Sequence, residues 1–173
     1  MAITINGNGT VSGITAGLTA ASLPTGAVLQ VLQTVKTDHT SQALTGVGNF
    51  FDVAGMSVAI TPSSTSNKIL VVATVNVCNS ADGRNNFLRL RRDSTDIGIG
   101  TAGGVTNAAI YDKADAKLQT LTMQHLDSPS TTSATTYKVR WSGENSDTYY
   151  LNRSAANTNE GASSHITVME IAA

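Results

Sequence analysis

The chain has few charges, few aromatic residues and a single cysteine. Only 13% of its 173 residues are charged, and 11 Lys+Arg stand against 12 Asp+Glu. A nucleic-acid partner would require a basic surface that releases counterions, so this balance argues against one. The polar surface must come instead from Thr, Ser, Asn and Gly. These residues suit short strands and turns, because Thr is β-branched while Gly and Asn favour turn conformations.

The lone cysteine and the short apolar runs exclude further classes. Cys78 cannot form an internal disulfide, and its apolar neighbours indicate a buried thiol and not a nucleophile. The longest apolar stretch, residues 69–77, is far shorter than the roughly 20 residues of a membrane helix. No positively charged region precedes an apolar core at the N-terminus, as a secretory signal would require. We therefore expect the protein to be made in the cytoplasm and not to insert into a membrane.

Alternating apolar and polar residues predict strands through most of the chain. In residues 69–77 every second residue is apolar, and we expect Val71, Ala73 and Val75 to face the interior. Leu70 and Val72 make the start of this strand apolar on both faces, which indicates a central strand. Further strands are expected at residues 27–35 (Leu29, Val31 and Val35 sharing a face), 50–60, 87–91 and 118–126.

Three more strands are expected at the end of the chain, at residues 136–141, 147–153 and 163–171. A terminal strand usually lies inside a sheet, because an untethered one would fray. Trp141 is interpreted as a core or subunit-interface residue, with a sugar-stacking platform as the alternative. Polar loops are expected at residues 38–49, 79–86 and 98–117, the last with one possible helical turn at 112–117. Eight to ten regularly spaced strands predict an all-β, jelly-roll-like antiparallel β-sandwich over residues 26–173.

Residues 1–25 differ from the rest and are interpreted as a short N-terminal anchor segment. Ile3 and Ile5 alternate with Thr4, residues 6–9 (NGNG) form a strong turn signal, and residues 10–14 could return as a second strand. The segment is too small for a core of its own, so it becomes ordered only against something else; a loose tail is the alternative. The candidate anchoring residues are Ile3, Ile5, Val11, Ile14 and Leu18.

No motif indicates catalysis, a cofactor or a metal. The glycine-rich residues 98–104 lack the Gly-Lys-Ser/Thr ending of a phosphate loop. His39, His125 and His165 lie far apart in the sequence, without metal-ligand spacing. Scattered aspartates leave a glycosidase-type carboxylate pair open, since the separation of such a pair is a property of the fold. We expect a protein that is not an enzyme and binds no cofactor or metal.

Several segments resemble a group of tailed-phage virion proteins, the fibre and decoration proteins often found in marine phages and cyanophages. The resemblance rests on residues 60–71 (ITPSSTSNKILV), 88–97 (LRLRRDSTDI), 149–153 (YYLNR) and 166–171 (ITVMEI). Residues 8–14 (NGTVSGI) through Leu23 and Pro24 resemble segments near the base of such fibres. The resemblance implies a trimeric jelly-roll head similar to tumour-necrosis-factor-type and complement-type globular domains.

The expected function is that of a homotrimeric virion protein on the particle surface, made in the host cytoplasm. The N-terminal segment would dock onto other tail or capsid proteins, and the head loops would contact a host-surface glycan or protein. Candidate host-contact residues are Arg84, Asn85, Asn86 and Tyr111. A capsid decoration protein that stabilises the shell is the alternative, with strand addition to capsid protein edges. A virion-associated glycan-degrading enzyme is a third, less favoured reading.

Overall fold

The computed structural model of the protein describes residues 4–5, 11–12, 23–81, 83–100, 108–112, 117–159 and 161–173. All regular structure in these residues is β. The strands are β1 (Thr4–Ile5), β2 (Val11–Ser12), β3 (Val28–Lys36), β4 (Thr40–Ala43), β5 (Phe51–Ile60), β6 (Lys68–Asn79), β7 (Arg84–Arg92), β8 (Thr95–Ile97), β9 (Ala108–Asp112), β10 (Gln119–Asp127), β11 (Thr135–Gly143), β12 (Thr148–Leu151) and β13 (Ser164–Ile171). No helix long and apolar enough to cross a membrane is found among the described residues.

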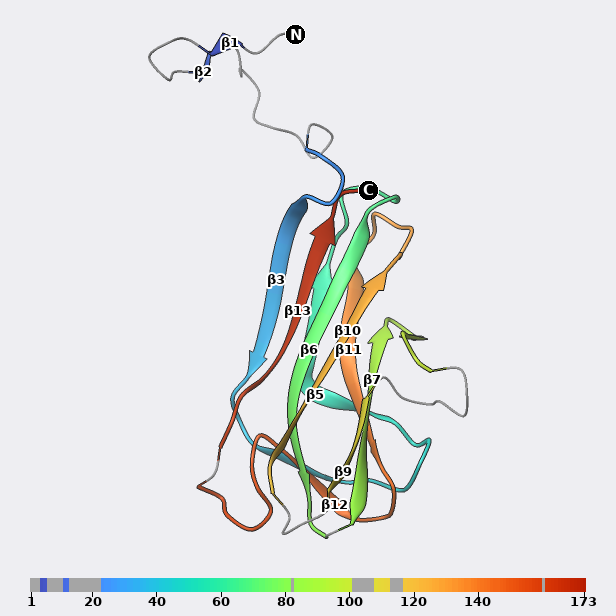
Figure 1. Ribbon diagram of the computed structural model, residues 1–173. Helices are drawn as coiled ribbons and strands as arrows, with labels where there is room; N and C mark the ends of the chain where they lie inside the picture. Colours follow the sequence, from blue (N-terminus) through green and yellow to red (C-terminus); the bar gives the residue numbers. More distant parts are fainter. Residues whose placement is uncertain are drawn as a thin grey trace.

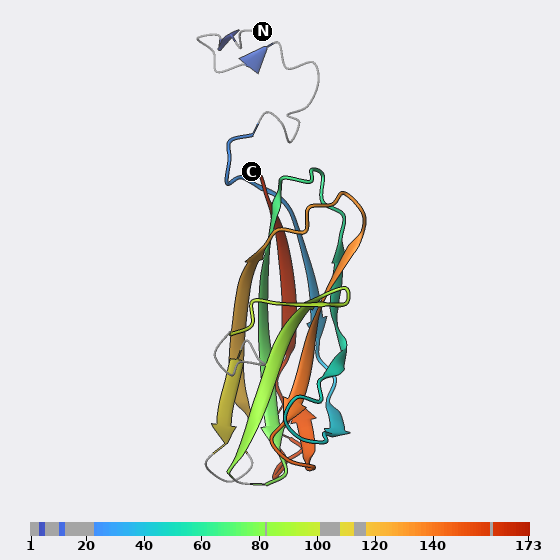
Figure 2. The ribbon, with the colours of Figure 1, turned by 90° about the vertical axis from the view of Figure 1, so that its right-hand side faces the viewer.

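Two antiparallel sheets form a sandwich (Figures 1 and 2). In the first sheet β13 lies between β3 and β6, β10 pairs with the opposite edge of β6, and β12 and β4 extend the sheet at the far end of β6. In the second sheet the order is β5-β11-β7, with β8 and β9 both pairing with β7. The strand orders β3-β13-β6-β10 and β5-β11-β7-β9 are those of a jelly roll, so the predicted fold class is confirmed.

The core lies between the sheets and follows the alternation of the sequence. Val71, Ala73 and Val75 are fully buried, as predicted, and β6 is the central strand of its sheet. Trp141 packs in the core at 2% exposure, which confirms its core assignment. The terminal strand β13 lies inside its sheet, as expected. Burying such apolar side chains contributes roughly 1.5–3 kcal/mol each.

Three predicted loops proved too long. Residues 38–49 contain β4, and Leu44, which follows it, is 1% exposed. The expected loop 79–86 shrinks because β6 runs on to Asn79 and β7 begins at Arg84. Residues 98–117 contain β9, and the proposed helical turn falls mostly outside the described residues. In each case the local β pattern is weak, and hydrogen bonding to a neighbouring strand makes the segment a strand nonetheless.

The two ends of the sandwich are different. At one end Gly26 N donates to Ala172 O (2.8 Å) and Ala172 N donates to Ala27 O (2.9 Å), so the chain joins β3 beside the C-terminus (Figure 1). At the other end lie the β6–β7 and β11–β12 turns. The segment before β3 and these turns are therefore separated by the full length of the strands.

The predicted N-terminal hairpin is present. β1 pairs with β2 in antiparallel register, with Ile5 opposite Val11 and Thr4 opposite Ser12. Ile5 and Val11 are anchoring candidates, but their side chains lie outside the described part of the structure. The candidates Ile3, Ile14 and Leu18 lie outside it altogether. Their anchoring role and the boundary after residue 25 stay predictions.

Candidate interaction surfaces

The outer face of the first sheet carries an uninterrupted apolar row. Pairing places Val31 opposite Met169, Met169 opposite Leu70, and Leu70 opposite Leu126, so one such residue comes from each of β3, β13, β6 and β10. Other apolar residues of these strands share the face. We call this surface the apolar face; it comprises Val28, Val31, Val35, Leu70, Val72, Leu126, Met169 and Ile171.

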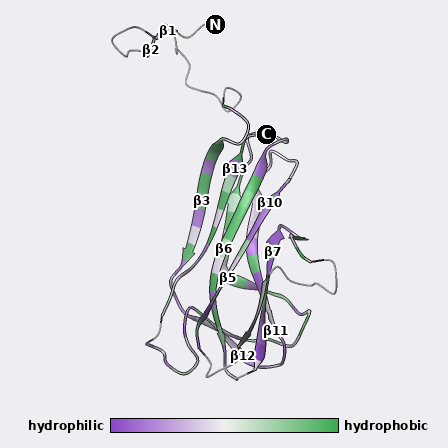
Figure 3. Ribbon diagram, viewed as in Figure 1, coloured by the Kyte–Doolittle hydropathy of each residue, from purple (hydrophilic) through white to green (hydrophobic). Residues whose placement is uncertain are grey.

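Several of these side chains are open to solvent. Val28, Val31, Val35 and Leu126 are 50–54% exposed, and the other four are half-buried. Figure 3 shows the hydrophobic colouring over much of β6 and on parts of β3. Solvated faces of antiparallel sheets usually carry polar side chains, and contiguous apolar patches on soluble proteins mark contact sites. This face therefore has the character of an interface.

The polar residues that lie between the members of the apolar face, on the same side of the sheet, are almost all neutral. Gln33 Nε2 donates to Thr167 Oγ1 (2.8 Å), and the hydroxyls of Thr74 and Thr122 lie 3.4 Å apart. Neutral groups that already pair with one another can be covered at a much smaller desolvation penalty than charges. This composition suits contact with another protein surface.

The second sheet has the opposite character. Its outer face holds what we call the charged face, which comprises Asp52, Arg89, Arg91, Asp96, Lys138 and Arg140. Asp52 binds Lys138 Nζ at 2.7 Å and Arg140 Nε at 2.9 Å. Asp96 pairs with Arg89 and lies 3.5 Å from Arg91 Nε. Burial raises the pKa of Asp52, but the hydrogen bond and the charge of Lys138, with Arg140, outweigh it and hold that pKa below its ordinary value.

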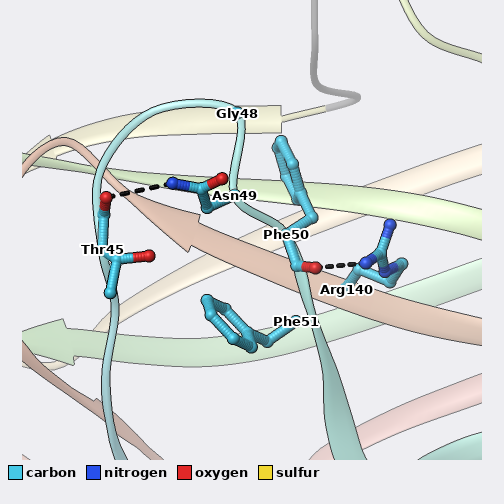
Figure 4. A pocket seen from close by; sticks show the side chains of 6 residues that line it. All are labelled: Thr45, Gly48, Asn49, Phe50, Phe51 and Arg140. Atoms are coloured by element: carbon cyan, nitrogen blue, oxygen red, sulfur yellow. Dashed lines mark hydrogen bonds between the residues drawn. The ribbon is translucent and has the colours of Figure 1, made fainter.

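A shallow cleft adjoins the charged face (Figure 4). It has a volume of about 410 Å³ and lies between the loop before β5, the start of β5 and the second half of β11. Arg140 belongs to both surfaces, and its guanidinium donates to Phe50 O. On the charged face, the Arg89 guanidinium stacks 3.8 Å from the centroid of the Phe50 ring. The residues that line the cleft are Thr45, Gly48, Asn49, Phe50, Phe51 and Arg140.

A buried carboxylate closes the sandwich at the end where β3 begins. Glu170 is 1% exposed, and its Oε1 accepts bonds from Ser63 N (2.6 Å), Ser63 Oγ (2.8 Å) and Asn67 Nδ2 (2.7 Å). Its Oε2 accepts from Gln30 Nε2 (2.6 Å). Burial raises the pKa of Glu170, yet these donors outweigh it and hold the pKa below its ordinary value of 4.5. The cluster ties β13, the β5–β6 turn and β3 together, so its role is structural.

A second buried acid is equally well satisfied. Asp127 accepts a hydrogen bond from Tyr137 Oη (2.7 Å), and Arg92 Nη1 lies 2.8 and 2.9 Å from its two oxygens. Burial and this bond raise the pKa of Tyr137. Nowhere in the described part of the chain do three or more His, Cys, Asp or Glu side chains gather in a way that could hold a metal ion. The expectations of no metal and no catalysis stay predictions.

The predicted host-contact residues lie together at the end opposite Gly26. Arg84 Nε binds Asp147 at 3.0 Å, and Asn85 Nδ2 binds Glu144 at 3.0 Å, which joins β7 to the β11–β12 turn. Tyr111 pairs with Asn85 across β7 and β9. All three belong to strands, whereas Arg84 and Asn85 were expected in the 79–86 loop and Tyr111 in the 98–117 loop. Asn86 points inward at 2% exposure, because alternation along β7 places it on the same side as Leu88.

The sequence alone predicted neither the apolar face nor the charged face as a complete surface. The shared face of Val31 and Val35 was visible in the sequence, but not that this face points outward. The inclusion of Leu29 was wrong, because a register shift at the start of β3 pairs Val28, and not Leu29, with Ile171. The outward-facing Arg89 and Arg91, followed closely by Asp96, were visible in the sequence. Asp52 is separated from its partners Lys138 and Arg140 by more than 80 residues, so no local pattern could reveal that these residues extend the same face.

No protein-family model and no curated protein matches the chain. Among solved structures it is similar to one of the Gt strain of infectious bursal disease virus, with 12% identity and a TM-score of 0.49 over 83% of this chain and 38% of that chain. It is also similar to the tumour-necrosis-factor protein Eiger of S. frugiperda, with 10% identity and a TM-score of 0.36 over 82% and 93% of the two chains. The chain thus spans about 38% of the length of the viral chain.

Proposed function

We propose that the protein is a homotrimeric structural protein of a tailed-phage virion. Its N-terminal segment docks onto the particle, and its jelly-roll heads project as a fibre tip or knob that contacts the host surface. The observation that carries this proposal is the apolar face. A surface of this kind favours association with a partner, and closed symmetric assemblies of one chain are the commonest solution.

The composition of the apolar face favours a second copy of the chain as its occupant. The face is nearly uncharged, so two copies can approach without like-charge repulsion. His165 and Lys68 are the titratable side chains that its paired residues include. The number of copies in the assembly, three, is what the resemblance to phage virion proteins implies.

The segments that carry this resemblance fall on structural parts of the sandwich. Residues 60–71 span the β5–β6 turn, 88–97 span the β7–β8 hairpin, and 166–171 lie in β13. The first and last of these meet at the buried Glu170, which binds Ser63 and Asn67. The resemblance thus involves residues that shape the head, which supports a shared architecture.

The separation of the two ends supports a surface-projecting arrangement. The segment before β3 joins the sandwich beside Ala172, while Arg84 and Asn85 lie at the opposite end. A head docked through its N-terminal segment would present this opposite end to the outside. Arg84 and Asn85 are held there by Asp147 and Glu144, which gives a contact surface a fixed shape.

Deletion of residues 1–25 tests the docking role. The truncated chain should fold, keep its oligomeric state and fail to join virions, whereas the full chain joins them. A truncated chain that unfolds would mean that the segment belongs to the sandwich. Copy number on purified particles then separates the two locations: tens of copies or fewer support a tail fibre, and hundreds would replace it with the capsid decoration role.

A further inference from the structure

We propose that the charged face and its adjoining cleft form a binding site for an acidic saccharide, one that carries carboxylate or phosphate groups. The inference deepens the proposed host contact and rests on it. It names a site on the flank of the head, distinct from the predicted residues Arg84 and Asn85. Three features carry it: an excess of positive charge, a preorganised cleft and the chemistry of the cleft lining.

The charged face has more cations than carboxylates. Four cationic side chains (Arg89, Arg91, Lys138 and Arg140) share two carboxylates, those of Asp52 and Asp96. Asp93, which lies between Arg91 and Asp96 in the sequence, is not a member of this face. It lies in the turn after β7, where its carboxylate accepts a hydrogen bond from Thr136 N (2.9 Å). Among the described residues, this face therefore carries two more positive charges than negative ones, although each cation lies near a carboxylate. Guanidinium groups in such a setting bind carboxylate and phosphate strongly.

The cleft is held in shape before any ligand binds. Leu44 N donates to Asp147 O (3.1 Å), and Ser142 Oγ donates to Gly46 O (2.9 Å), which ties the loop to β11 and to the turn that follows it. Asn49 Nδ2 donates to Thr45 O (3.1 Å) across the loop. Gly46 and Gly48 adopt positive φ angles of 99° and 91°, which suit glycine. A fixed loop reduces the ordering entropy that binding must overcome.

The lining of the cleft matches a sugar ring. The Thr45 hydroxyl and the Asn49 side-chain carbonyl make no hydrogen bond to the described parts of the chain, so they can meet sugar hydroxyls. The ring of Phe51 is only partly buried and offers an apolar surface to the C–H groups of a sugar. Arg140 stands across from the loop and connects this lining to the charged face (Figure 4). A volume of about 410 Å³ lies within the usual range for small-molecule sites.

A nucleic acid fits this surface less well. Single strands bind through exposed aromatic rings on which bases stack, and the Phe50 ring is 7% exposed beneath Arg89. The chain as a whole carries a net charge of −1, which does not favour a polyanionic backbone. The observations therefore favour an acidic saccharide over a nucleic acid.

The test measures binding of a labelled trigalacturonate to the full-length chain, with neutral maltotriose and an oligothymidylate as competing probes. We expect trigalacturonate to bind, and both other probes to bind at least about tenfold more weakly. The double variant Arg91→Gln/Lys138→Gln should weaken binding about tenfold, because it removes two charge-assisted contacts. The matched control Lys117→Gln, a cation before β10 in the other sheet, should stay within about twofold of the original affinity.

The decisive variant is Asp52→Asn, which removes the carboxylate that competes for Lys138 and Arg140. It should tighten trigalacturonate binding severalfold, a gain that partial unfolding cannot mimic. Equal binding of maltotriose, tighter binding of the oligothymidylate, or an unchanged affinity of Asp52→Asn would each overturn the proposal. Light scattering on the same samples separates the two proposals. A trimer that does not bind the saccharide leaves the assembly role standing and overturns only this site.

Discussion

The two outer faces of the sandwich differ more than any other two regions of the molecule. The apolar face presents valine, leucine, isoleucine and methionine across four strands, whereas the charged face presents six ionic side chains across β5, β11, β7 and β8. Both sheets contribute the same kind of alternating inner face to one core. The difference thus lies entirely in the residues that do not build the core.

This contrast shows what each sheet is free to do. Core positions are fixed by packing, so the outer positions of a strand carry whatever its environment requires. An ion-paired outer face is well solvated in water, while covering an apolar face is favourable because it removes apolar surface from water. The sandwich therefore has one side suited to face solvent and one side suited to be covered by a partner, which we propose is another copy of the chain.

The largest expected effect comes from placing a charge on the shared inner face. Val75→Asp buries a carboxylate without a partner between the sheets and should lower the free energy of unfolding by about 3 kcal/mol or more. The matched control Ser57→Asp places the same group on the exposed side of β5, beside Lys138, and should change stability by less than about 0.5 kcal/mol. Thermal or urea unfolding of both variants measures this. A tolerated Val75→Asp would contradict the assignment of β6.

The next effect concerns the carboxylate that is buried on the inner side of β13. Glu170→Ala leaves the donors of Gln30, Ser63 and Asn67 without an acceptor and should cost about 1–3 kcal/mol. The pKa of Glu170 is lower folded than unfolded, so its stabilising contribution is present above pH 4.5 and is lost as the pH falls through the folded pKa. Urea unfolding across this acidic range should show a loss that Glu170→Ala lacks. The same acid-induced loss in both proteins would contradict this role.

A smaller effect is expected on the charged face. Asp96→Asn removes the acid that Arg89, Arg91 and Arg140 share and should lower stability by about 1 kcal/mol. The difference from the original protein should shrink in 1 M NaCl, since salt screens pairs near the surface. Urea unfolding at low and high salt measures it. A loss that does not depend on salt would mean that Asp96 acts through packing instead.

The sequence predicted the inner faces better than the outer ones. Every second residue from Ile69 to Val77 is apolar, and burial of that face follows wherever β6 is placed. By contrast, β4 (TSQA) and β9 (AAIYD) show no clear alternation of apolar and polar residues, and pairing with β12 and β7 defines them as strands. The face of Val31 and Val35 was correctly grouped, but pairing with β13 decides that it points outward. Long-range pairing is what local patterns cannot supply.

The smallest change in stability is expected for a double variant that tests association through the apolar face. Val31→Glu/Leu126→Glu places two carboxylates on the apolar row, where both original side chains are 54% exposed. The fold of a single head should change little, because exposed positions tolerate charge. Association through this face should be lost, because each carboxylate would be desolvated against an apolar surface. The control Ala59→Glu on the exposed side of β5 should leave association intact.

Light scattering at micromolar concentration tests the central claim directly. The original protein and Ala59→Glu should show three times the 17.9 kDa mass of one chain. Val31→Glu/Leu126→Glu should show the mass of one chain, with an unchanged far-ultraviolet circular dichroism spectrum. A monomeric original protein, or a double variant that keeps the trimer mass, would contradict the claim that the apolar face joins copies of this chain.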